Sequence, residues 1–82
     1  MDWYEHYEAS LRALANTEDA IRAEDWIAGL RWLGKTNEHY GHVAVELAQR
    51  AYDGGATKKS IALALDVPVS TLRGITKTAL LP

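Results

Sequence analysis

Two histidines and a glutamate are spaced so that one helix face can present all three. His39 and His42 are three residues apart, and Glu46 follows four residues after His42. Such spacing occurs among helical metal ligands, although three groups still need a fourth ligand or water. His6 is the only other histidine. The cluster is more typical of a solvated helix face, and we expect no metal site.

Carboxylates are plentiful in the first half of the chain, but hydrolysis needs a pair held in a cleft with one raised pKa. A chain of 82 residues leaves little room for such a cleft. Gly54-Gly55 is better explained as a helix end than as a phosphate loop, and no nucleophile is paired with a histidine. We therefore expect no enzyme, no catalytic residue and no cofactor. The acidic residues considered are Glu5, Glu8, Glu18, Asp19, Glu24 and Asp25.

The cations are distributed unevenly along a chain whose net charge is −2. Residues 1–55 hold ten acidic side chains and five Lys or Arg, whereas residues 56–82 hold one acid, Asp66, and four cations. Charge asymmetry of this kind indicates a basic contact surface in the second half. The four cations are Lys58, Lys59, Arg73 and Lys77.

Helical periodicity accounts for most of the chain and predicts an all-α fold. Helices are expected over residues 2–15, 18–33, 37–53 and 57–65, with a fifth from residue 69 to about 78. Asn16-Thr17 and Gly34 are the expected breaks within the first half. The expected inward residues of the first three helices are Trp3, Tyr7, Leu11, Leu14, Ala20, Ala23, Ile27, Leu30, Tyr40, Val43, Ala44, Leu47, Ala48 and Ala51.

These helices predict a single small domain, residues 1–82, in which 1–35 form a helical pair and 36–82 a trihelical unit. The last two helices fit a helix-turn-helix. Ala62 is the small residue at the helix crossing, and Asp66 takes the turn position that requires positive φ. Val67 fills the turn. The other expected core positions of this unit are Ile61, Leu65, Leu72 and Ile75.

The segment "GATKKSIALALDVPVSTLR" resembles the trihelical helix-turn-helix family of resolvase-type domains, small phage repressors and actinobacterial regulators. The resemblance covers about residues 43–79. Two departures are Asp66, where the family usually has Gly, and Gly74 inside the expected recognition helix.

The resemblance implies that residues 69–78 enter the major groove of double-stranded DNA. Arg73 is the expected guanine contact. The implied function is a sequence-specific regulator of the phage or bacterial repressor type, or a recombination accessory factor. The residues expected near bases or the sugar-phosphate backbone are Val69, Ser70, Thr71, Arg73, Gly74 and Lys77, with Thr57, Lys58 and Lys59 at phosphates.

Aromatic residues gather in the first two expected helices, and they either enlarge the core or form a surface for a partner. A helix-turn-helix protein with four cations gains by binding as a homodimer, which doubles its contacts. The alternative function is a protein-interaction module, in which the acidic aromatic half docks a host or partner protein. The residues assigned to a dimer or partner surface are Trp3, Tyr4, Tyr7, Trp26 and Trp32.

The chain contains no cysteine, which excludes disulfides and thiolate metal sites. No apolar segment is long enough for a membrane span, and the N-terminus lacks the pattern of a signal peptide. These features predict a cytoplasmic protein without a membrane partner.

Overall fold

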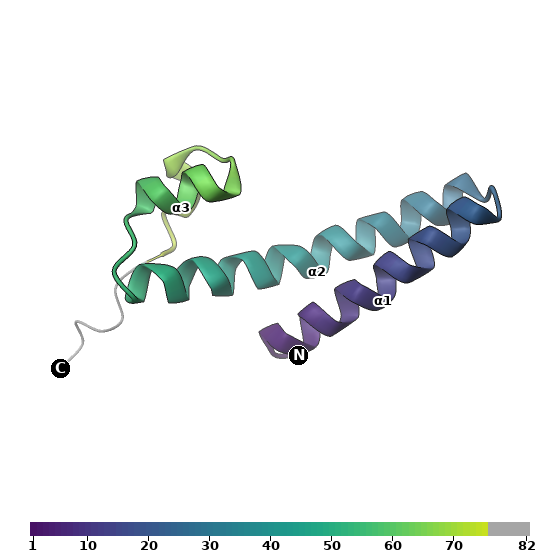
Figure 1. Ribbon diagram of the computed structural model, residues 1–82, viewed down its shortest axis with the longest axis horizontal. Helices are drawn as coiled ribbons and strands as arrows, with labels where there is room; N and C mark the ends of the chain where they lie inside the picture. Colours follow the sequence, from purple (N-terminus) through teal and green to yellow (C-terminus); the bar gives the residue numbers. More distant parts are fainter. Residues whose placement is uncertain (76–82) are drawn as a thin grey trace. The chain divides into compact units, whose positions relative to one another are not determined.

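The computed structural model describes residues 1–75, and over these residues the fold is entirely helical. It contains α1 (Trp3–Arg22), α2 (Trp26–Asp53), α3 (Lys58–Leu65) and the short 3₁₀ helix η1 (Val69–Leu72) (Figure 1). The predicted all-α class is confirmed. The predicted number of five helices is wrong, because residues 1–75 form three α-helices and one short 3₁₀ helix. The chain divides into two compact units, Met1–Ala44 and Val45 onward, and α2 continues through the division.

Helix α1 runs through the predicted break at Asn16-Thr17. Its start agrees with prediction, because the Asp2 carboxylate caps the helix and accepts a hydrogen bond from the Glu5 N–H at 2.8 Å. Thr17 stays helical because its hydroxyl donates to the Ala13 carbonyl at 2.9 Å, which satisfies the hydroxyl inside the helix.

Helix α2 likewise continues through the predicted break near Gly34. Asp25 begins the helix by accepting a hydrogen bond from the Ala28 N–H at 3.1 Å. The Thr36 hydroxyl donates to the Trp32 carbonyl at 2.9 Å, as in α1. The first two predicted breaks are therefore replaced by one turn, at residues 23–25.

The first unit is an antiparallel hairpin of α1 and residues 26–44 of α2, and its seam consists mainly of small residues. A Cβ added at Gly29 would lie 3.9 Å from the Ala20 Cβ, so the two backbones approach closely. Small residues allow such an approach. The buried residues of the seam are Ser10, Ala13, Thr17 and Ala20 on α1 and Gly29, Thr36 and Val43 on α2.

The apolar stripes predicted to face inward are mostly exposed in the hairpin. Leu11, Leu14, Ile27 and Leu30 are 44 to 66 % exposed. The prediction was wrong because it assumed that the largest apolar side chains pack between the helices. Other predicted core residues of the hairpin that are exposed are Tyr7, Ala23 and Tyr40.

All three α-helices end with the same hydrogen-bond pattern, the Schellman motif. In each, one residue adopts positive φ: Glu24 (φ 58°), Gly55 (φ 108°) and Asp66 (φ 57°). After α3, the Val67 N–H donates to the Ala62 carbonyl at 3.1 Å and the Asp66 N–H to the Leu63 carbonyl at 3.2 Å. The left-handed turn predicted at Asp66 is confirmed.

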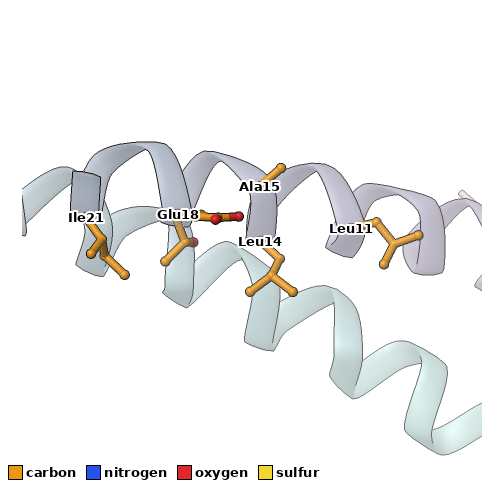
Figure 2. A pocket seen from close by; sticks show the side chains of 6 residues that line it. Leu11, Leu14, Ala15, Glu18 and Ile21 are labelled. Carbon is orange, nitrogen blue, oxygen red and sulfur yellow. The ribbon is translucent and has the colours of Figure 1, made fainter. Parts of the chain in front are cut away.

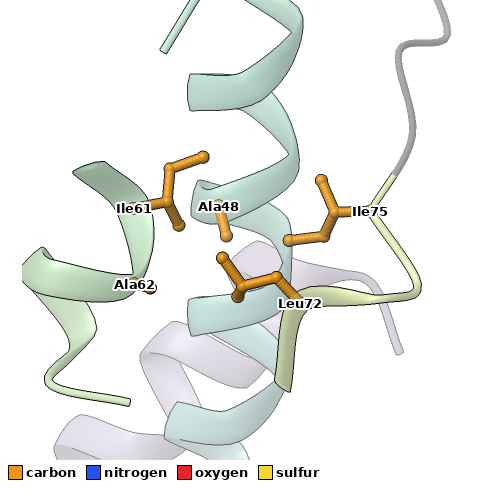
Figure 3. Close-up of a cluster of buried hydrophobic side chains, with 5 residues drawn as sticks. All are labelled: Ala48, Ile61, Ala62, Leu72 and Ile75. Atoms are coloured by element: carbon orange, nitrogen blue, oxygen red, sulfur yellow. The ribbon is translucent and has the colours of Figure 1, made fainter. Parts of the chain in front are cut away.

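The second unit has its own small core, drawn in Figure 3. The cluster joins Ala48 of α2, Ile61 and Ala62 of α3, and Leu72 and Ile75. Tyr52, Ala56 and Val67 pack against it. The predicted core residues are confirmed here, except that Leu47, Ala51 and Leu65 are exposed.

Across residues 1–75, none of the helices combines the length and the apolar character needed to cross a membrane.

Candidate nucleic-acid interface

The first turn of α3 carries two of the predicted phosphate contacts. Thr57 caps the helix, accepting a hydrogen bond on its hydroxyl from the Ser60 N–H at 3.1 Å. Lys59 is exposed, whereas Lys58 is half-buried with its Nζ 5.6 Å from the centre of the Tyr52 ring. That geometry is a cation–π contact, which holds the Lys58 ammonium near the helix start. Free N–H groups at a helix N-terminus attract anions, so both lysines lie where a phosphate is favoured.

The turn between α3 and η1 is fixed at both ends. Asp66 and Val67 close α3 with two backbone hydrogen bonds, and Val67 packs against the core cluster. Pro68 then starts η1, and its carbonyl accepts from the Thr71 N–H at 3.0 Å. Buried Leu72 anchors η1 to α3, so the segment after the turn has a defined position within this unit.

The predicted recognition helix over residues 69–78 is wrong for the part that the structure describes. Only Val69–Leu72 is helical, as a 3₁₀ turn, and Arg73 and Gly74 form a turn. The β-branched residues Val69 and Thr71, together with Gly74, lower the helix propensity of this segment. Residues 76–78, including Lys77, lie outside the described residues.

The edge of η1 that faces away from the core holds the predicted base-contacting residues. Leu72 and Ile75 are buried, and the residues between and before them are exposed. This edge therefore presents two hydroxyls and one guanidinium, groups that bond to base edges or phosphates. The exposed residues are Val69, Ser70, Thr71, Arg73 and Gly74.

The two units carry opposite charge over the described residues. Residues 1–44 contain eight acidic and four basic side chains, a net charge of −4, whereas residues 45–75 contain three acidic and four basic ones, a net charge of +1. Arg50 forms an ion pair with Glu46 at 2.9 Å. The charge available for a polyanion in the second unit therefore comes from Lys58, Lys59 and Arg73.

The aromatic residues predicted to form a partner surface occupy separate parts of the hairpin. Trp3 and Tyr4 make an edge-to-face contact, with ring centres 5.6 Å apart, and Tyr7 lies next to Tyr4 at 5.7 Å. These three lie in the first two turns of α1, whereas Trp26 begins α2 beside the hairpin turn. Trp26 is 61 % exposed and Trp32 is 38 % exposed.

The three histidines of the chain come together on the hairpin, which the sequence did not reveal for His6. His6 Nδ1 and His39 Nδ1 share a hydrogen bond at 2.8 Å, and the His6 ring stacks on His42 with centres 3.9 Å apart. The sequence did contain one indication: His6 continues the three-four spacing of the buried seam of α1, which places it on the side of α1 that faces α2. Among residues 1–75, no group of three or more histidines and carboxylates is arranged to hold a metal ion.

Acidification is expected to weaken the hairpin through His6. Burial lowers the pKa of His6 below its usual 6.5, and the positive charges of His42, His39 and the N-terminus lower it further, against an opposing effect of Glu38. The unfolded chain then binds more protons than the folded chain, so the free energy of unfolding falls as the pH drops below 6.5. Melting temperatures measured at about pH 7.5 and about pH 5 should show the loss.

The variant His6→Gln supplies the control, because glutamine cannot gain the proton. Its melting temperature should change less between the two pH values than that of the wild type. Equal pH dependence in the two proteins would contradict the role of His6.

No protein family matches the chain, and no curated protein or solved structure is significantly similar to it.

Proposed function

We propose that the protein binds double-stranded DNA through α3 and η1 and acts as a sequence-specific regulator of the phage or bacterial repressor type, in the cytoplasm. The observation that carries this proposal is the arrangement of the second unit. Ala62 is 3 % exposed where η1 packs on α3, and Asp66 makes the left-handed turn between them. This combination is typical of a helix-turn-helix, whose second element meets the major groove.

The groups on this surface have distinct roles in the proposed complex. Arg73 is the only arginine among residues 57–75, and it bonds to the O6 and N7 acceptors of a guanine. Ser70 and Thr71 bond to a neighbouring base or phosphate. Lys58 and Lys59 contact phosphates beside the start of α3 and set the position of the protein on the duplex.

The small number of cations sets how binding responds to salt. Each phosphate that a Lys or Arg neutralises adds about 0.9 to the slope of log affinity against log salt concentration. The three cations at this surface within the described residues therefore give a slope of about −3 per chain. Affinity should fall measurably between about 50 and about 200 mM salt.

Fluorescence anisotropy with labelled duplexes tests the proposal, first on a random pool and then on sequences selected from it. Arg73→Ala should cost about 1–3 kcal/mol on the selected sequence and relax the preference at one base pair. Lys59→Ala should weaken binding to all duplexes alike and reduce the salt slope by about one.

Arg31→Ala is the matched control, because it removes an exposed cation from the hairpin instead. It should bind the selected duplex like the wild type. The proposal fails if the folded wild type binds no duplex at about 50 mM salt, or if Arg31→Ala and Arg73→Ala lose the same affinity.

A further inference from the structure

The hairpin carries a second apolar stripe on each helix beside its buried seam. On α1 the stripe falls at positions 4, 7, 11, 14, 18 and 21, and on α2 at positions 26, 30, 33, 37, 40 and 44. Both follow the alternating three-four spacing of helices that pack in coiled coils and bundles. The large side chains in these stripes are 38 to 65 % exposed. They are Tyr4, Tyr7, Leu11, Leu14, Ile21, Trp26, Leu30, Leu33 and Tyr40.

The two stripes lie on the same side of the hairpin. Each exposed stripe comes one residue after its buried seam, as Leu14 follows Ala13 and Leu30 follows Gly29, and is therefore rotated about 100° around the helix. Figure 1 shows that α1 and residues 26–44 of α2 run in opposite directions, in agreement with the contact between His6 and His39. Equal rotations around two such helices turn both stripes to one face. We call the twelve stripe positions the apolar face.

The opposite side of the hairpin is charged, and the contrast makes the apolar face distinct. Glu18 is the only charged residue of the apolar face, and Asn37 is the only other strongly polar one. On the other side, the positions one residue before a buried seam residue include Arg12, Asp19 and Lys35. Glu5, Arg31 and Glu38 continue the same three-four spacing.

A shallow groove runs along the α1 part of the apolar face. It has a volume of about 480 Å³ and is lined by Leu11, Leu14, Ala15, Thr17, Glu18 and Ile21. Figure 2 shows Leu14 and Ile21 extending from α1 on the side where α2 passes. Side chains of another helix with the same spacing fit such a groove as knobs between the residues that line it.

We propose that the apolar face binds the apolar face of a second copy of this chain, so that two hairpins form a four-helix bundle. In such a bundle each helix contacts two neighbours at about a right angle. On each helix the buried seam and the stripe of the apolar face are about 100° apart, which meets that requirement. This proposal does not depend on DNA binding.

The area of the face supports a second copy as the occupant. Nine half-exposed large side chains at roughly 100 Å² each amount to on the order of 900 Å². Stable interfaces bury about 800 Å² on each partner. A two-fold dimer also requires a surface that complements itself, and a face with one charged residue out of twelve avoids strong repulsion between copies.

The small seam gives a second reason. Within residues 1–44 the buried apolar side chains are Ala13, Ala20 and Val43. Helices in water depend on packing of an apolar face for most of their stability. The hairpin therefore needs the larger side chains of the apolar face to be buried as well.

Sedimentation equilibrium of the full chain, from micromolar to submillimolar concentration, tests the proposal. The expected mass is twice the 9.1 kDa of the chain, and the melting temperature should rise with protein concentration, because dissociation accompanies unfolding. A wild type that remains monomeric, with a melting temperature independent of concentration, overturns the proposal and leaves the face to a different partner.

Two neighbouring substitutions locate the interface. Leu30→Glu adds a charge to the apolar face and should give a monomer, whereas Arg31→Glu adds the same side chain to the charged side and should remain a dimer. If both variants remain dimeric, the interface lies elsewhere and the proposal fails. If Leu30→Glu does not fold, Leu30→Ala decides, with an expected weakening of dimerisation of at least about tenfold against unchanged dimerisation in Arg31→Ala.

Discussion

Leu72→Ala is expected to unfold the second unit at room temperature. Leu72 is 4 % exposed and is one of three large side chains in a core of five buried residues. Truncating a buried leucine to alanine costs about 2–5 kcal/mol. Folded domains have only about 0.05–0.15 kcal/mol of stability per residue, so the loss is comparable with the whole stability of a unit of this size.

Amide hydrogen exchange followed by NMR provides the measurement. The amides of α3 in Leu72→Ala should lose their protection, and DNA binding should be lost with them if the proposed function holds. Leu63→Ala is the matched control, since Leu63 lies on α3 but is 73 % exposed. Its stability should stay within about 0.5 kcal/mol of the wild type. Retained protection in Leu72→Ala would mean that η1 does not contribute to this core.

Ala13→Leu is expected to destabilise the hairpin by about 1–3 kcal/mol, because it overpacks the seam. Ala13 is 4 % exposed and lies between Ser10 and Thr17 on the buried side of α1. A leucine at that point has no space unless the two helices move apart. Urea denaturation with far-UV circular dichroism measures the change in the free energy of unfolding.

Two further variants separate packing from helix propensity. Glu8→Leu places the same side chain at an exposed position of α1 and should change stability little. Gly29→Ala should raise stability by up to about 1 kcal/mol, because alanine favours the helix and its Cβ meets Ala20 at an ordinary 3.9 Å. Greater stability of Ala13→Leu than of the wild type would contradict the closely packed seam.

The features that the sequence predicted correctly depend on local interactions. Asp2 and Thr57 cap helices through one side-chain hydrogen bond each, and Asp66 reverses the chain through its own backbone angles. The core of the second unit was also predicted for the most part. Ile61 and Ala62 were expected on the inward side of the first helix of a helix-turn-helix, and Leu72 was expected to anchor the segment after the turn.

The errors arose where tertiary burial decides between two local structures. Breaks were predicted at Asn16-Thr17 and Gly34, because threonine favours helix caps and glycine favours helix ends. A threonine inside a helix is nevertheless satisfied when its hydroxyl bonds to the carbonyl four residues earlier, as in Thr17 and Thr36. The helix predicted after Pro68 is wrong for a different reason. Beyond Leu72 the local sequence does not favour a helix, because Gly74 has a low helix propensity. The residues proposed to contact bases were therefore named from the sequence, but the element that carries them was not predicted correctly.

The hydroxyls of the hairpin seam have a consequence for how this chain can change during evolution. Ser10, Thr17 and Thr36 each donate to a carbonyl of their own helix, so none of these three hydroxyls donates a hydrogen bond to a partner residue on the other helix. Serine, alanine and threonine are close to interchangeable at these positions, since only their size is constrained. We therefore expect related chains to conserve side-chain volume along the seam more closely than residue identity.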